Sequence, residues 1–220
     1  MTPLQERLLS IRSTIPNAAE LVAVSKFHPT ETLMEAYQMG QRIFGESRVQ
    51  ELCGKQEAMP RDVQWHFIGP LQRNKVKYLA PFIAMIHSVD SVALLETIDQ
   101  QAARLNRQID ILLEFHIATE ESKQGFTLDD AIAHFGQTPP STYPNVRFRG
   151  VMGMASFSDD HALVEGEFAQ LKVIFETLKQ AIFTDEPLFD QLSMGMSNDY
   201  PIALRHGATL VRIGTSIFIG

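Results

Sequence analysis

Two stretches of the chain, LVAVSK at Leu21–Lys26 and IDILLEFHI at Ile109–Ile117, decide the expected fold. Both are almost continuously apolar and rich in β-branched residues, which is typical of parallel strands buried on both faces. Similar runs recur along the chain and alternate with stretches of helical spacing. The other expected strands are Arg42–Glu46, Gln64–Gly69, Ile83–Ser88, Arg147–Met152, Phe189–Met194 and Thr209–Ile213.

Helical segments lie before and between these strands. Ala162–Phe183 is the longest, and its apolar residues recur every three or four positions, as they do on one face of a helix. Glu31–Met39 is followed by Gly40, a residue type that commonly comes just after the last turn of a helix. Val92–Leu105 has the same spacing, and Pro3–Ile15 adds a helix before the first strand.

Eight strands alternating with helices form either a closed (β/α)8 barrel or an open doubly wound sheet. Eight is the strand number of the barrel, and the G-x-G-x-x-G motif of open nucleotide-binding sheets does not follow the first strand. A chain of 220 residues also suits one barrel. We therefore predict a single TIM barrel with an extra N-terminal helix, formed by one domain over residues 1–220.

The composition excludes several classes of protein. The net charge of −7 argues against a broad nucleic-acid surface, because neutralising phosphates requires a surplus of Lys and Arg. The single cysteine, Cys53, cannot form an internal disulfide, and no Cys/His cluster has zinc-ligand spacing. The chain shows neither a signal peptide nor an apolar run of membrane-spanning length. We expect a soluble, cytoplasmic monomer with no membrane partner.

The strand ends are the first places to look for function, because chemistry in a barrel of this kind occurs there. Lys26 closes the first strand, so its side chain points either into the barrel mouth or along the wall. Burial disfavours the charged form of a lysine and makes its amine a nucleophile toward an aldehyde. The structural alternative is an ion-paired or snorkelling lysine. Position alone does not decide between the two.

The next strand ends are less specific. Glu46 can orient Lys26 or pair with Arg48, and Ser47 offers a hydroxyl at the rim. Among bulky apolar neighbours, His66 is expected to be a hydrogen-bonded core residue rather than a catalyst. The remaining polar residues are expected to cap or begin helices; they are Ser88, Asp90 and Ser91 after the fourth strand, and the basic cluster Arg73–Lys77, with Gln72, after the third.

The loops after the last two strands predict a phosphate site. Ser197 follows the seventh strand, and Gly214-Thr215 follow the eighth. Barrel phosphate sites commonly combine these two loops with a helix N-terminus, whose free N–H groups and positive dipole suit a phosphate dianion. The hydroxyls of Ser197 and Thr215 can add to it, and Gly214 allows close approach of the backbone. Helix capping would explain either loop alone, but both together with Lys26 favour a phosphate-bearing cofactor.

Arg212 lies inside an apolar run just before the second of these loops. A buried arginine stays protonated and needs an acceptor. If it faces the nitrogen of a pyridine ring, it keeps that nitrogen unprotonated and weakens the ring as an electron sink. The structural alternative is a salt bridge with an acid at another strand end.

Taken together, these segments resemble the YggS/PROSC family of pyridoxal 5′-phosphate (PLP) homeostasis proteins. The last matching stretch is long and specific, and the matches run in order along nearly the whole chain. They are LVAVSKFHP (21–29), IFGESRVQE (43–51), WHFIGPLQRNKVK (65–77), IHSVDS (86–91), ESKQGF (121–126) and LSMGMSNDYPIALRHGATLVRIGTSIF (192–218).

The resemblance implies a barrel similar to the N-terminal domain of alanine racemase, which holds PLP as a Schiff base on Lys26. It also implies that Arg212 faces the pyridine nitrogen. The other implied cofactor-binding residues are Ser47, Met194, Ser197, Gly214 and Thr215. The family usually has asparagine where this chain has Ser47, whose side chain is shorter than that amide. GVMGMAS at 150–156 departs more mildly from the family pattern, and the end of the chain lacks the usual charged tail.

Three functions fit these features: a non-catalytic PLP carrier or regulator, a PLP-dependent racemase or decarboxylase, and a Schiff-base aldolase. The racemase-type enzymes need a second domain that brings a Tyr or Cys across the cofactor, and this chain ends shortly after its eighth strand. The aldolases need a buried acid beside the lysine, and their lysine tends to lie on a later strand. We expect a carrier in vitamin B6 and amino-acid homeostasis, with PLP-dependent enzymes as recipients and no turnover of its own.

Overall fold

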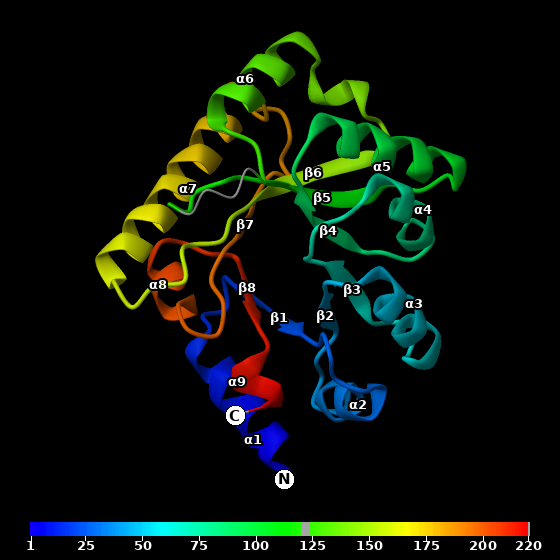
Figure 1. Ribbon diagram of the computed structural model, residues 1–220, viewed down its shortest axis with the longest axis vertical. Helices are drawn as coiled ribbons and strands as arrows, with labels where there is room; N and C mark the ends of the chain where they lie inside the picture. Colours follow the sequence, from blue (N-terminus) through cyan, green and yellow to red (C-terminus); the bar gives the residue numbers. More distant parts are fainter. Residues whose placement is uncertain (120–123, 220) are drawn as a thin grey trace.

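The computed structural model describes residues 1–119 and 124–219. Its eight parallel strands close into a barrel in chain order, and the helices pack around the outside (Figure 1). The ladder between the first and last strands, with Ala23 beside Ile213, closes the sheet. The predicted TIM barrel and its extra N-terminal helix are confirmed. Within the described ranges, no helix is long and apolar enough to cross a membrane.

All eight predicted strands are present, but several end earlier than predicted. Lys26, Gly69 and Ile117 were expected inside strands and lie in loops. The apolar runs are longer than the ladders because residues beyond a strand stay buried, such as Phe115 at 2% exposure. The bounds are β1 (Glu20–Val24), β2 (Ile43–Glu46), β3 (Gln64–Phe67), β4 (Met85–Val89), β5 (Ile109–Glu114), β6 (Val146–Met152), β7 (Gln191–Ser193) and β8 (Leu210–Ile213).

Four helices agree with prediction to within two residues: α1 (Pro3–Thr14), α2 (Thr30–Gln38), α5 (Val92–Arg104) and α7 (His161–Ala181). Five helices were missed, three of them because four to six residues show too little periodicity. They are α3 (Val49–Ala58), α4 (Val76–Leu79), α6 (Leu128–Gln137), α8 (Tyr200–Arg205) and α9 (Thr215–Phe218). Short 3-10 turns form at η1 (Arg73–Lys75) and η2 (Pro140–Thr142), so the basic cluster does begin a helical segment.

The interior of the barrel has an apolar layer and a polar layer. The apolar layer consists of Val22, Met85, Leu112, Met152 and Leu210, which form a cluster separate from the main core. Residues two positions further along a strand point to the same side. Met85, Leu112 and Leu210 are therefore followed inside the barrel by polar side chains. The polar layer consists of the buried residues His66, His87, Glu114, Ser193 and Arg212.

A chain of hydrogen bonds runs through the polar layer. Arg212 Nη1 donates to Ser193 Oγ at 2.6 Å, Ser193 Oγ lies 3.0 Å from His87 Nδ1, and His87 Nε2 lies 2.9 Å from His66 Nδ1. Because Ser193 accepts from a guanidinium, we assign its own proton to His87, which then donates to His66. Burial lowers the pKa of His66 to about 3 and that of His87 well below its usual value, so both rings are neutral. The prediction that His66 is a hydrogen-bonded core residue is confirmed.

Glu114 is the acid of the polar layer, at 8% exposure. Burial raises the pKa of its carboxyl to about 7; the charge of Asp90 adds to this shift and that of Arg212 opposes it. Between the ordinary value of 4.5 and about 7, the folded state therefore keeps a proton that the unfolded state has released. The fold loses stability through this residue as the pH rises across that window.

Glu114→Gln removes this loss because glutamine cannot ionise. We expect the unfolding free energy of the variant, relative to wild type, to rise by about 3 kcal/mol from about pH 4.5 to about pH 8. Urea unfolding at a series of pH values measures it. Glu57→Gln, at an exposed position of α3, is the control and should show no such trend. A difference for Glu114→Gln that does not change with pH would contradict the assignment.

Candidate functional site

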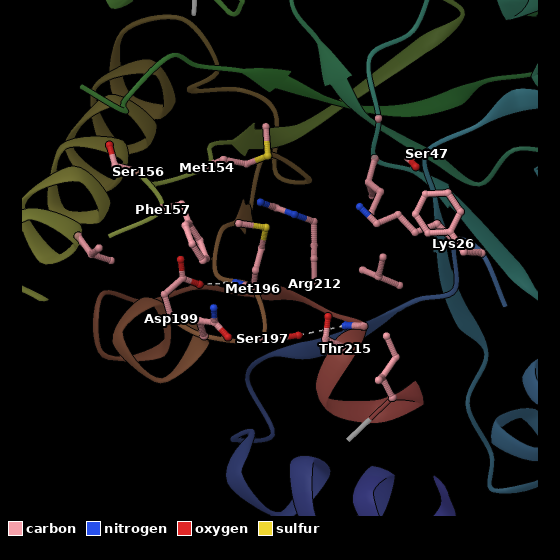
Figure 2. A pocket seen from close by; sticks show the side chains of 18 of the residues that line it. Lys26, Ser47, Met154, Ser156, Phe157, Met196, Ser197, Asp199, Arg212 and Thr215 are labelled. Carbon is pink, nitrogen blue, oxygen red and sulfur yellow. Dashed lines mark hydrogen bonds between the residues drawn. The ribbon is translucent and has the colours of Figure 1, made fainter. Parts of the chain in front are cut away.

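A pocket of about 810 Å³ opens where the strands end. Its lining comes from the loops after β1, β2, β3, β6, β7 and β8, on the face of a TIM barrel that carries function. Figure 2 shows Arg212 in the middle of the pocket, with Lys26 and Ser47 on one side and Ser197 and Asp199 on the other.

Most of the predicted cofactor residues meet in this pocket. Those that line it are Lys26, Ser47, Ser197, Arg212, Gly214 and Thr215. The structure does not bring Met194 to the pocket, since its side chain is fully buried in the main core. Alternation explains the difference: Ser193 points into the barrel, so its neighbour Met194 points out toward the helices. Met196 lines the pocket instead.

Lys26 reaches the mouth of the pocket from a turn rather than from the strand. The strand ends at Val24, Ser25 is fully buried, and the chain turns at Lys26-Phe27. Phe27 has a φ of 68°, which is unusual for a residue with a side chain. Lys26 is exposed, so the burial that was expected to activate its amine is not observed.

Among the described residues, Glu46 makes no direct hydrogen bond or ion pair with Lys26 or with Arg48, the two partners that had been considered. Its Oε1 accepts hydrogen bonds from Ser25 Oγ and Lys55 Nζ, both at 2.6 Å. Burial raises the pKa of this carboxyl, and the hydrogen bonds from Lys55 and Ser25 oppose the shift. Arg48 instead lies over a ring, 4.7 Å from the centroid of Phe27.

Lys55 was missed by the sequence analysis, although it is central to this corner of the site. Its Nζ donates to Ser25 O at 2.7 Å and forms ion pairs with Glu46 and Glu51, each at 2.6 Å. We call Ser25, Glu46, Glu51 and Lys55 the Lys55 cluster. The i, i+4 spacing of Glu51 and Lys55 was the available signal, because such pairs are neighbours on one helix face.

The hydrogen-bond donors that suit a phosphate lie on the loops after β7 and β8. Gly214 N–H donates to Ser197 Oγ at 3.4 Å, which joins the two loops. Among the described residues, the N–H groups of Ser197 and Thr215 and the hydroxyl of Thr215 make no hydrogen bond. A Cβ on Gly214 would lie 2.8 Å from Val24 O, so this glycine allows β8 to approach β1 as well as leaving the pocket open.

Arg212 forms the floor of the pocket and is 4% exposed. Its Nη1 donates to Ser193 Oγ and its Nη2 to Gly153 O at 3.0 Å. Within residues 1–119 and 124–219 it makes no salt bridge, so the structural ion pair that had been considered is not found among them. Burial lowers its pKa to about 10, against the attraction of Asp199 and Glu114, and it remains a cation at neutral pH.

Asp199 adds a carboxylate to the same pocket. Its Oδ1 accepts from Met196 N–H at 2.5 Å, which turns it toward its own loop. Burial raises the pKa of this carboxyl, and the bond from Met196 opposes the rise. Asp199 occupies the N-cap position of α8 but makes no side-chain cap hydrogen bond there.

The loop after β6 was also missed as part of the pocket, although Met154, Ser156 and Phe157 line it. The strand-end rule applied equally to GVMGMAS and would have found it. Glu167, buried on α7, holds this loop by accepting from Ser156 N–H and Ser156 Oγ, both at 2.7 Å.

The expected caps after β4 differ in the structure. Ser91 occupies the N-cap position of α5, but its hydroxyl donates to Asp90 Oδ1 at 2.9 Å and makes no cap hydrogen bond. Ser88 Oγ donates to Gly69 O at 2.6 Å. In ESKQGF, residues 121–123 lie outside the described residues.

Comparison with known proteins adds to this geometry. The family model for the N-terminal domain of alanine racemase matches residues 2–220. A protein of Pasteurella multocida is 37% identical over 207 residues, covering 92% of this chain and 86% of its own. A protein of Schizosaccharomyces pombe is 38% identical over 229 residues, covering 99% and 93%. Both are named pyridoxal phosphate homeostasis protein.

Solved structures agree with the fold. PipY of Synechococcus elongatus, solved with PLP bound, has a TM-score of 0.87 and 38% identity, over 98% of this chain and 99% of its own. Alanine racemase from E. faecalis has a TM-score of 0.75 at 15% identity, over 97% of this chain and 57% of its own, which shows the shared fold alone.

The resemblance seen in the sequence is confirmed. The chain belongs to the alanine racemase N-terminal domain family, among the pyridoxal phosphate homeostasis proteins.

Proposed function

We propose that this protein binds PLP covalently through Lys26 and acts as a non-catalytic PLP carrier or regulator in vitamin B6 homeostasis. One observation carries the proposal: a single pocket unites an exposed lysine, a set of free phosphate-type donors and a buried arginine cation. The names of the relatives and the PLP bound in PipY support the same ligand.

The residues fit the cofactor at both ends. The N–H groups and hydroxyls of Ser197 and Thr215 would hold the phosphate, as charge-assisted hydrogen bonds to a dianion. Lys26 would provide the amine, and Ser47 a further polar contact. PLP supplies an aldehyde, whose carbon forms a C=N bond to a lysine nitrogen while its oxygen leaves as water. Arg212 would face the ring nitrogen, and a cation there disfavours protonation of that nitrogen.

Two features favour carriage over catalysis. Arg212 would weaken the ring as an electron sink, and the described lining residues include no Tyr or Cys to exchange a proton with a substrate. The relatives are named homeostasis proteins rather than enzymes. For the aldolase alternative, no buried acid contacts Lys26 among the described residues, since Glu46 is bound to Lys55. Recipient PLP-dependent enzymes, a monomeric state and a cytoplasmic location stay predictions.

Lys26→Ala tests the attachment point. Wild-type protein mixed with PLP should gain an absorbance band near the edge of the visible range, and the variant should lose it because the amine is gone. Lys77→Ala, at an exposed lysine outside the pocket, is the matched control and should keep the band. A band of full intensity in Lys26→Ala would contradict the assignment.

The phosphate donors can be tested by comparing PLP with pyridoxal, which lacks the phosphate. Ser197→Ala and Thr215→Ala should each weaken PLP binding about tenfold or more, the cost of one hydrogen bond to a charged group. Pyridoxal binding should change little. Equal weakening of both ligands would place the phosphate elsewhere.

The carrier assignment predicts no turnover. Purified protein loaded with PLP and incubated with a panel of amino acids should produce neither racemised nor decarboxylated product, as followed by chiral chromatography and CO2 release. Steady product formation that is lost in Lys26→Ala would establish an enzyme instead.

A further inference from the structure

We propose that Glu51 and Lys55, which lie outside the PLP pocket, are positioning residues that hold the turn carrying Lys26 in its binding conformation. The inference rests on the proposed function and extends it to residues beneath the site. Neither side chain lines the pocket. Each acts on the backbone next to Lys26, on opposite sides of it.

The Lys55 cluster forms hydrogen bonds with both sequence neighbours of Lys26, which are Ser25 and Phe27. On the strand side, Ser25 O accepts from Lys55 Nζ at 2.7 Å, and Ser25 Oγ donates to Glu46 Oε1 at 2.6 Å. On the other side, Phe27 N–H donates to Glu51 Oε1 at 2.7 Å. The Lys55 ammonium forms ion pairs with both Glu46 and Glu51, so a single cation links the hydrogen bonds on the two sides of Lys26.

The backbone conformation at Phe27 requires stabilising contacts of this kind. A φ of 68° places a side-chain-bearing residue in the left-handed region, which is unfavourable unless surrounding contacts enforce it. Packing does not enforce it, since Phe27 is 63% exposed. Two hydrogen bonds oppose relaxation to negative φ: His28 N–H donates to Ser25 O at 3.1 Å and closes the turn, and Phe27 N–H donates to Glu51, the side-chain contact of the two.

The buried pair of the Lys55 cluster, Glu46 and Lys55, makes these hydrogen bonds rigid. Glu46 is fully buried, and Lys55 is 6% exposed. Lys55 cannot leave without stranding the Glu46 carboxylate, whose Oε2 already has no partner among the described residues. Lys55 is therefore fixed, and it fixes Glu51 in turn. If Glu51 is lost, the turn relaxes and Lys26 is no longer directed at the pocket.

Glu51→Ala is the test variant, because Glu51 is only partly buried and its loss leaves the pair between Glu46 and Lys55 intact. Glu51→Gln keeps an acceptor oxygen for Phe27 and should rescue. Glu57→Ala removes the same charge from an exposed position of the same helix and is the matched control. Thermal melts verify that all three variants fold.

The first readout uses the protein without PLP. Amide hydrogen exchange of Phe27, followed by NMR, should be at least about tenfold faster in Glu51→Ala and close to wild type in Glu51→Gln and Glu57→Ala. Unchanged exchange in Glu51→Ala would overturn the proposal, whether or not the protein binds PLP.

The second readout compares PLP with pyridoxamine 5′-phosphate, which has the phosphate but no aldehyde. Glu51→Ala should bind PLP about fivefold to tenfold more weakly, with less PLP trapped on Lys26 by borohydride, while pyridoxamine 5′-phosphate binds as in wild type. Equal weakening of both ligands would indicate a general structural defect and overturn the positioning role. If wild type traps no PLP on Lys26, the proposed function fails. The exchange experiment still tests whether Glu51 holds the backbone at Phe27.

Discussion

The ladder between β1 and β8 is the constraint on which the site depends. It pairs Val22 with Arg212, so the residues just beyond each strand emerge side by side although about 190 positions separate them in the chain. Lys26 and Thr215 reach one pocket for this reason. Gly214 keeps the two strand ends close, because a Cβ there would meet the carbonyl of Val24 at 2.8 Å.

Beneath the pocket, part of the barrel interior is a polar layer instead of an apolar one. Among the described residues, Arg212 is held there by a hydroxyl and a carbonyl rather than by a carboxylate. The hydroxyl, that of Ser193, is also hydrogen-bonded to His87, which in turn is hydrogen-bonded to His66. A guanidinium without a paired acid keeps its charge available to a ligand above it. Burying such a group is costly, and the bonds to Ser193 and Gly153 occupy two of its donors without neutralising its charge.

The same division recurs at the edge of the site. Lys26 is exposed, while two of the charges that hold its turn, Glu46 and Lys55, are buried one layer below. Glu46 and Lys55 form a pair away from water, and Glu51 extends that pair to the backbone of Phe27. The reactive group is thus separated from the groups that orient it, which leaves its amine free for the ligand.

The sequence by itself determined the barrel, the strand order and six of the residues that line the pocket. Periodicity is local, and parallel strands that close in order bring all their ends to one face, so Lys26, Ser197, Gly214 and Thr215 could be assigned before any coordinates. The tertiary structure alone decided which way side chains point and what they contact. Met194 is excluded from the pocket by the pleat, Lys26 leaves the strand before it reaches the mouth, and Lys55 crosses from a helix to grip a turn thirty residues earlier in the chain. These outcomes depend on where each ladder stops and on buried charges finding partners, and neither is encoded in the spacing of apolar residues.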